Sequence, residues 1–240
     1  MPPPFAAVYF DCDSTLSAIE GVDELLAFAP ASLRDDVLRL TTEAMEGTRP
    51  LAEVYERRLR LLAPRREQLD RIGELYAARL VPDAPALVAA LQALGKQVGI
   101  VSGGLLVPVQ HVARQLGIPL PNVHAVPLLF DERGAYLDFD HGSPLWRNGG
   151  KIEVLRQLPA THRPVAFVGD GITDLETQGT ADLFVGFGGV ANRARVRERA
   201  QAFVATPSLA PVLAHVTTPG EREQLARDPR FAPLLSAAKA

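Results

Sequence analysis

Four aspartates and one serine follow short, largely apolar runs of the sequence. Such runs, bounded by polar or glycine-containing segments, indicate strands buried on both faces of a sheet. Because the reactive loops of an open parallel sheet collect at the carboxyl ends of its strands, we expect these side chains to meet at one edge. They are Asp11 and Asp13 after residues 5–10, Ser102 after residues 98–101, and Asp170 and Asp174 after residues 165–168.

Clustered carboxylates need a compensating cation, since like charges side by side cannot all stay ionised. Oxygen-only ligands suit magnesium, which usually keeps waters and a substrate phosphate as its remaining ligands. Ser102, followed by Gly103 and Gly104, offers a hydroxyl and backbone N–H groups to a phosphate. Lys151, one of only three lysines, adds a point cation. Together these groups predict phosphoryl transfer to a carboxylate nucleophile, with a metal ion and a positively charged phosphate site.

Strand and helix patterns alternate between residues 82 and 214, which predicts an α/β fold with a Rossmann-like, doubly wound parallel sheet. Between residues 20 and 80 the apolar residues recur at helical spacing with prolines between the segments, which indicates an inserted helical bundle. We therefore expect an α/β core at 1–16 and 81–216, a helical cap at 17–80, a β-hairpin flap at 127–139 and a peripheral tail at 217–240.

The composition narrows the class of protein. The 240 residues are 47% hydrophobic and 22% charged, which is typical of a globular chain. A net charge of -3 provides no basic field for nucleic acid or anionic lipid. The single cysteine, Cys12, excludes an internal disulfide and a multi-cysteine metal site. No signal-peptide pattern and no apolar run of membrane-spanning length is present, so we expect a cytoplasmic protein.

Four motifs resemble, in order and spacing, those of the haloacid dehalogenase superfamily, and further segments resemble its phosphoserine phosphatases. The resemblance covers about residues 5–213. It implies a magnesium-dependent phosphatase that hydrolyses O-phosphoserine through an aspartyl-phosphate intermediate. Leu51 stands where the family commonly has a phenylalanine, a departure that bears on the fit to serine. The superfamily motifs lie at 10–16, 101–104, Lys151 and 169–174, and the phosphoserine phosphatase segments lie at 20–25, 44–47, 56–59, 148–151 and 186–189.

The resemblance also implies a role for each matched residue. Asp11 would be the nucleophile, and Asp13 would be the general acid for the leaving oxygen and then the general base for water. Magnesium would be held by Asp11, Asp13 through its backbone carbonyl, and Asp170, with Asp174 close behind. The substrate would contact Ser102, Gly103 and Lys151 at its phosphoryl group, Glu20 at its ammonium, Arg58 at its carboxylate, and Met45 and Thr173 along the pocket.

Alternatives stay open at this level. The same chemistry fits another small phosphomonoester, or phosphoryl transfer to an alcohol. A non-catalytic phosphoamino-acid sensor is a third reading, although a sensor needs no nucleophile. Charged helix residues are often only a solvated face, and Arg58 lies among four other arginines between residues 57 and 66. The expected partner is a small phosphomonoester, with no nucleic acid and no membrane, while the oligomeric state and the preference for magnesium over manganese are not predicted.

Overall fold

The computed structural model describes residues 4–45 and 49–239, and for residues 41–45 it describes the backbone alone. A six-stranded sheet with the order β3-β2-β1-β6-β7-β8 forms the centre of the molecule, and all neighbouring strands are parallel. This confirms the predicted α/β fold class. The strands are β1 (Ala7–Phe10), β2 (Gln97–Leu105), β3 (Val123–Val126), β6 (Val165–Gly169), β7 (Leu183–Phe187) and β8 (Ala202–Val204).

Strand β1 lies in the middle of the sheet, where both of its faces are buried. It pairs in parallel with β2 on one side and with β6 on the other. Phe10 is in register with Ile100 and Val168, so the residues that follow these three lie side by side at the same edge of the sheet. This pairing explains why motifs separated by about 160 residues of chain meet at one place.

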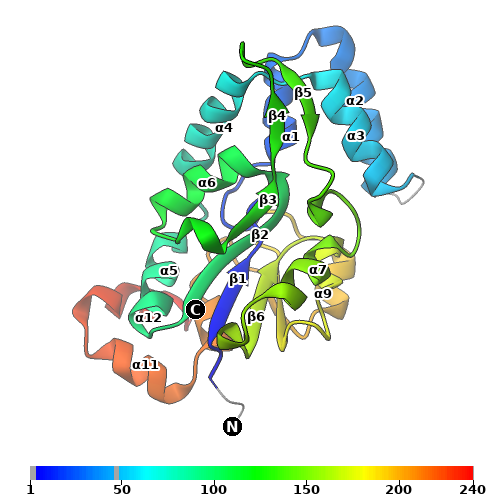
Figure 1. Cartoon of the computed structure of the whole chain (residues 1–240). Helices are drawn as coiled ribbons and strands as arrows, with labels where there is room; N and C mark the ends of the chain where they lie inside the picture. The colour runs from blue at the N-terminus through cyan, green and yellow to red at the C-terminus, as the bar shows by residue number, and fades with distance from the viewer. Residues whose placement is uncertain (1–3, 46–48, 240) are drawn as a thin grey trace.

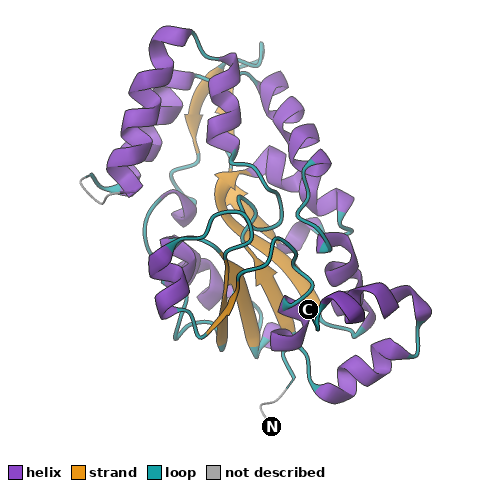
Figure 2. Ribbon diagram, turned by 180° about the vertical axis from the view of Figure 1, so that it is seen from behind, coloured by secondary structure: helices purple, strands orange, loops and turns teal. Residues whose placement is uncertain are grey.

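Helices flank the sheet on both sides (Figure 2). They bury the faces of a sheet whose strands carry apolar side chains in both directions. In the described part of the chain, no helix combines the length and the apolar character that crossing a bilayer requires. The flanking helices include α5 (Ala84–Ala93), α6 (Leu106–Gln115), α7 (Gly150–Gln157), α8 (Ile172–Leu175), α9 (Ala194–Arg199) and α10 (Val212–Val216).

The helices predicted between residues 20 and 80 are present, and they lie beyond the carboxyl ends of β1 and β2 together with the β4–β5 hairpin (Figure 1). Pro30 and Pro50 immediately precede the second and third α-helices, where a proline is tolerated because the first helical N–H groups need no partner. The elements are α1 (Gly21–Leu25), the short 3₁₀ helix Leu26–Phe28, α2 (Ala31–Met45), α3 (Leu51–Leu62), α4 (Arg66–Ala78), β4 (Leu128–Phe130) and β5 (Tyr136–Phe139).

The sequence prediction was wrong about the end of β2. The strand was expected to stop before Ser102, but it continues through the two glycines to Leu105. Pairing with β3 shifts register after Val101 and resumes at Leu105, opposite Val126. Glycines often mark such irregular strand ends, and here the backbone stays extended through them. Ser102 therefore lies within the last part of the strand rather than in a loop.

The segment expected to be a peripheral tail is folded and packed. It forms α11 (Pro219–Ala226) and α12 (Ala232–Ala237), at the opposite end of the molecule from α2 and α3 (Figure 1). Leu225, Phe231 and Leu234 are buried in the core. The buried Lys96 Nζ donates to the carbonyl oxygen of Phe5 at 2.8 Å and lies 2.5 Å from Glu221 Oε1. The high charge of the segment obscured these few anchoring contacts.

Candidate active site

Three aspartate side chains converge at the carboxyl edge of the sheet. Asp11 follows β1, Asp170 follows β6, and Asp174 lies in the first turn of α8. One carboxylate oxygen of each lies within 4.8 Å of the others, and all three residues are buried. Asp174 is held in place because its Oδ2 accepts a hydrogen bond from Gly171 N at 2.7 Å. The convergence follows from the parallel pairing of β1 with β6.

Lys151 places a buried cation among these carboxylates. Its Nζ lies 2.9 Å from Asp11 Oδ1 and donates a hydrogen bond to Asp174 Oδ1. Only 4% of the residue is exposed. Burial by itself lowers the pKa of Lys151, but the charges of Asp11 and Asp174 outweigh it, so the pKa is raised and the side chain stays protonated.

Lys151 and Arg193, whose Nε lies 2.9 Å from Asp170 Oδ2, do not offset the burial of three carboxylates. Burial first, and the charge of Asp11 second, raise the pKa of Asp170 to about 7 and that of Asp174 to about 8. A divalent cation would remove this penalty, because it favours the ionised form of each ligand. A compact, buried, oxygen-only donor set fits a hard divalent cation such as magnesium.

The carboxyl of Asp13 lies close to the aspartate cluster, and its two oxygens have different neighbours. Its Oδ1 accepts hydrogen bonds from the Tyr76 hydroxyl and from Gly21 N, the latter at 3.3 Å. Its Oδ2 points toward Gly104, where an added Cβ would lie only 2.6 Å away. Burial, followed by the charges of Glu20 and Asp11, raises its pKa well above the usual range. Such a carboxyl retains a proton that it can donate.

Ser102 is fully buried at the end of β2. Its Oγ accepts a hydrogen bond from Gly104 N at 3.0 Å. A Cβ at Gly104 would come within 3.2 Å of this oxygen as well as pressing on Asp13, so a glycine is needed for the close approach. Gly103, half-buried, lies between them. Hydroxyl and backbone groups here adjoin the aspartates, as expected from the neighbouring strands.

Two charged residues of opposite sign reach the site from the inserted helices. Glu20 Oε1 accepts a hydrogen bond from Ser14 Oγ at 2.6 Å. Burial lowers the pKa of Arg58, although the nearby charges of Glu20 and Asp13 act in the opposite direction, whereas Arg57 beside it is exposed. The structure therefore brings Arg58, and not its neighbour, toward the aspartates.

Three residues singled out from the sequence, Thr173, Met45 and Cys12, are described by the structure to different extents. Thr173 is half-buried in the first turn of α8, between Asp170 and Asp174 in sequence. Met45 is the last residue of α2, and its side chain lies outside the described residues. Cys12 is fully buried in the core, as the alternation of side chains along a strand predicts.

Arg193 and Tyr76 are among the side chains that contact the predicted residues and that sequence reasoning missed. Arg193 Nε donates to Asp170 Oδ2 at 2.9 Å, and its Nη2 lies 3.5 Å from Glu20 Oε1. Its position just beyond the carboxyl end of β7 could have suggested it, but it is one of four arginines between residues 193 and 199. Tyr76, the partner of Asp13, is one of the buried residues of α4. Its helical spacing indicates that the side chain is buried, but not that its hydroxyl has a catalytic partner.

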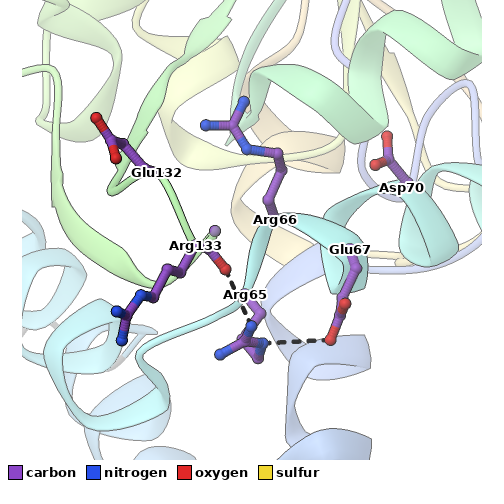
Figure 3. A pocket seen from close by; sticks show the side chains of 7 residues that line it. Arg65, Arg66, Glu67, Asp70, Glu132 and Arg133 are labelled. Atoms are coloured by element: carbon purple, nitrogen blue, oxygen red, sulfur yellow. Dashed lines mark hydrogen bonds and ion pairs between the residues drawn. The ribbon is translucent and has the colours of Figure 1, made fainter.

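A separate cavity of about 300 Å³ lies between the start of α4 and the β4–β5 turn (Figure 3). Arg65 spans it, since its Nη2 donates to the carbonyl oxygen of Arg133 at 3.1 Å and its Nε to Glu67 Oε1 at 3.2 Å. Arg66 N also donates to Gly134 O at 3.0 Å. None of the predicted site residues lines this cavity, which marks the contact between the inserted helices and the hairpin.

Comparison with known proteins agrees with this geometry. Residues 5–178 match a family model described as haloacid dehalogenase-like hydrolase. The chain is 39% identical over 200 residues to the phosphoserine phosphatase of Bos taurus, covering 82% of this chain and 88% of the relative. The phosphoserine phosphatase of Homo sapiens is 38% identical with the same coverage. A solved substrate-bound phosphoserine phosphatase complex shares the fold, with a TM-score of 0.76 at 23% identity over 90% of this chain and 100% of that chain.

Proposed function

Since the chain belongs to the haloacid dehalogenase-like hydrolase family, we propose that it hydrolyses O-phosphoserine to serine and phosphate through an aspartyl-phosphate. One observation carries the proposal. The Asp11, Asp170 and Asp174 cluster with Lys151 adjoins Asp13, and two residues of opposite charge, Glu20 and Arg58, interact electrostatically with Asp13 and with each other. The cluster fits a phosphoryl group and its metal, and the pair fits the ammonium and carboxylate of an amino acid. The substrates of the 38–39% identical relatives support the same assignment.

Asp11 is the proposed nucleophile. Its Oδ1 accepts a hydrogen bond from Cys12 N at 2.8 Å and lies beside Lys151, so the carboxylate has a fixed orientation. A carboxylate oxygen of Asp11 forms a bond to phosphorus while the bond from phosphorus to the seryl oxygen breaks. Lys151 and the Ser102 hydroxyl hold the phosphoryl oxygens during the transfer.

Asp13 moves the protons in both halves of the proposed reaction. It first gives its proton to the departing seryl oxygen, which leaves as the serine hydroxyl. It then takes a proton from the water that attacks the aspartyl-phosphate, releasing phosphate and restoring Asp11. When bound by Asp11, the Asp13 carbonyl and Asp170, with Asp174 close behind, magnesium would neutralise phosphate charge.

The inserted helices act, in this proposal, as a cap spanning residues 17–80, and the hairpin at 127–139 acts as a smaller flap. The contacts of Gly21 and Tyr76 with Asp13, and the position of Arg58, support this division. A cap of this kind excludes bulk water, which strengthens the electrostatic interactions inside the site, and supplies the groups that recognise the amino acid.

A phosphate-release panel tests the proposal. Purified protein is incubated with phosphorylated amino acids, sugars and glycerol phosphates, each with magnesium and with a chelator. We expect O-phosphoserine to rank among the best substrates and its turnover to depend on added magnesium. If another phosphomonoester is preferred by more than about a hundredfold in kcat/KM, or about 2.7 kcal/mol, the amino-acid assignment is wrong while the phosphatase assignment stands.

A further inference from the structure

The carboxyl of Asp13 is hydrogen-bonded by residues of the inserted helices, although Asp13 itself follows a strand of the central sheet. Its Oδ1 accepts hydrogen bonds from the Tyr76 hydroxyl on α4 and from Gly21 N at the start of α1. Tyr76 lies 63 residues from Asp13 in the chain, and Gly21 is the first residue of α1. The orientation of this carboxyl therefore depends on how α1 and α4 are seated against the core.

Tyr76 is fixed where it makes this contact. The residue is fully buried, and its carbonyl oxygen accepts a hydrogen bond from Ser17 Oγ at 3.2 Å. Gly21 leaves room for the phenol, because a Cβ there would lie 2.3 Å from the Tyr76 hydroxyl oxygen. The absence of a side chain at position 21 is thus what allows the hydroxyl to reach Asp13.

The second oxygen of Asp13 faces the phosphate site. A Cβ at Gly104 would come within 2.6 Å of Asp13 Oδ2 and within 3.2 Å of Ser102 Oγ, so the carboxyl oxygen and the serine hydroxyl flank the same small space. With Oδ1 held by Tyr76 and Gly21, rotation of the carboxyl is restricted, and Oδ2 remains on the side of Gly104 and Ser102 Oγ.

We propose that Tyr76 is a positioning residue that holds the Asp13 carboxyl in line with the leaving oxygen, an inference that rests on the proposed function. Tyr76 touches neither substrate nor metal in this assignment. It acts through Asp13, and because it lies on α4 it couples proton transfer to the seating of the inserted helices. A misplaced general acid lowers the rate of proton transfer but not the affinity for the substrate, since binding of the substrate does not use the proton.

The test compares two leaving groups in the Tyr76→Phe variant. The seryl oxygen needs a proton to leave, whereas nitrophenolate leaves without one. The parameter kcat/KM covers steps up to release of the leaving group, so it reports this difference and not the later attack of water. We expect kcat/KM for O-phosphoserine to fall between about tenfold and a hundredfold, kcat to carry the loss, and para-nitrophenyl phosphate to change by less than about threefold.

Tyr9→Phe is the matched control. Tyr9 is also fully buried, and its hydroxyl is hydrogen-bonded to His162 Nδ1 at 2.9 Å, so both variants remove one buried hydroxyl with a partner. The ratio of the two kcat/KM values should remain at the wild-type value in Tyr9→Phe. Gly21→Ala, which displaces the Tyr76 hydroxyl, should shift the ratio in the same direction as Tyr76→Phe.

The outcomes separate the inference from the proposed function. An equal loss with both substrates, no loss with O-phosphoserine, or the same shift in Tyr9→Phe would overturn the role of Tyr76. Asp13→Asn provides the other arm, measured with the same two substrates. If Asp13→Asn turns over O-phosphoserine at the wild-type rate, the proposed mechanism itself fails, and the role of Tyr76 fails with it.

Discussion

Replacing Lys151 by methionine tests the charge balance of the aspartate cluster. Methionine keeps most of the side-chain length and removes the cation that lies 2.9 Å from Asp11 Oδ1. Asp11 and Asp174 are then left buried with no neighbouring ammonium. Removing one partner of a buried ion pair typically costs about 3–5 kcal/mol, because the other charge stays desolvated. We expect the metal-free protein to approach a loss of this size at high pH. Lys151 lowers the pKa of Asp174, so its removal raises that pKa further and lets the carboxyl escape the cost by staying protonated at lower pH.

Magnesium should restore much of this loss, since it supplies charge to the same carboxylates. A ligand at about a hundred times its Kd stabilises a protein by about 2.7 kcal/mol. Without the competing ammonium the variant should bind the metal more tightly than the wild type, so magnesium should raise its Tm by more. Turnover of O-phosphoserine should nevertheless stay at least about a hundredfold below wild type, because no cation holds the phosphoryl oxygens.

Lys96→Met is the matched control for this prediction. Lys96 is also buried and paired with one carboxylate, Glu221, but it lies at the opposite end of the sheet from the aspartates. Thermal unfolding with chelator and with magnesium, and phosphate release, are measured for both variants. Lys96→Met should be less stable than the wild type, and magnesium should raise its Tm by no more than it raises the wild-type Tm. Its turnover should equal that of the wild type. An unchanged metal-free Tm in Lys151→Met, or equal rescue of both variants by magnesium, would refute the reasoning.

Further predictions concern single groups. Asp11→Asn should abolish phosphate release while leaving the circular dichroism spectrum and Tm near wild type, and substantial residual turnover would exclude Asp11 as nucleophile. Arg58→Ala should raise KM for O-phosphoserine by about tenfold or more, and the same rise with an aryl phosphate would contradict carboxylate recognition. The raised pKa values of Asp170, about 7, and Asp174, about 8, lie above their ordinary 3.8. The unfolded chain therefore releases these protons first, so the metal-free free energy of unfolding should fall as pH rises from about 4 to 8. Urea titrations across this range should show the fall with chelator and a smaller one with magnesium, and a rise with chelator would contradict the sign.

The parts of the site that sequence could predict are those fixed by strand ends. Asp11 and Asp170 follow apolar runs that become neighbouring parallel strands, so their meeting follows from topology alone. Ser102 was predicted at the same edge, although its strand continues past it because the two glycines stay extended. These predictions needed only the pattern of apolar runs and the meeting of the carboxyl ends of parallel strands at one edge of the sheet.

The missed parts depend on packing between segments far apart in the chain. Tyr76 belongs to the apolar stripe of α4, and only the seating of that helix above Gly21 turns its hydroxyl toward Asp13. Arg193 is one of several arginines in its segment, and the packing of α9 against α8 and β7 places this residue, which precedes the helix, beside Asp170. A helix periodicity identifies which face is buried, but not which polar atom on that face meets a partner.

The central claim is that phosphate passes from O-phosphoserine to Asp11. Rapid mixing of the protein with radiolabelled O-phosphoserine and magnesium, followed by acid quenching and peptide mapping, tests it directly. The account predicts label on the peptide that contains Asp11, formed within the first turnover and absent in Asp11→Asn. Label on a different residue would contradict it. So would turnover of a labelled aryl phosphate without labelled protein in Asp13→Asn, because that leaving group needs no proton and only breakdown of the intermediate should be slowed.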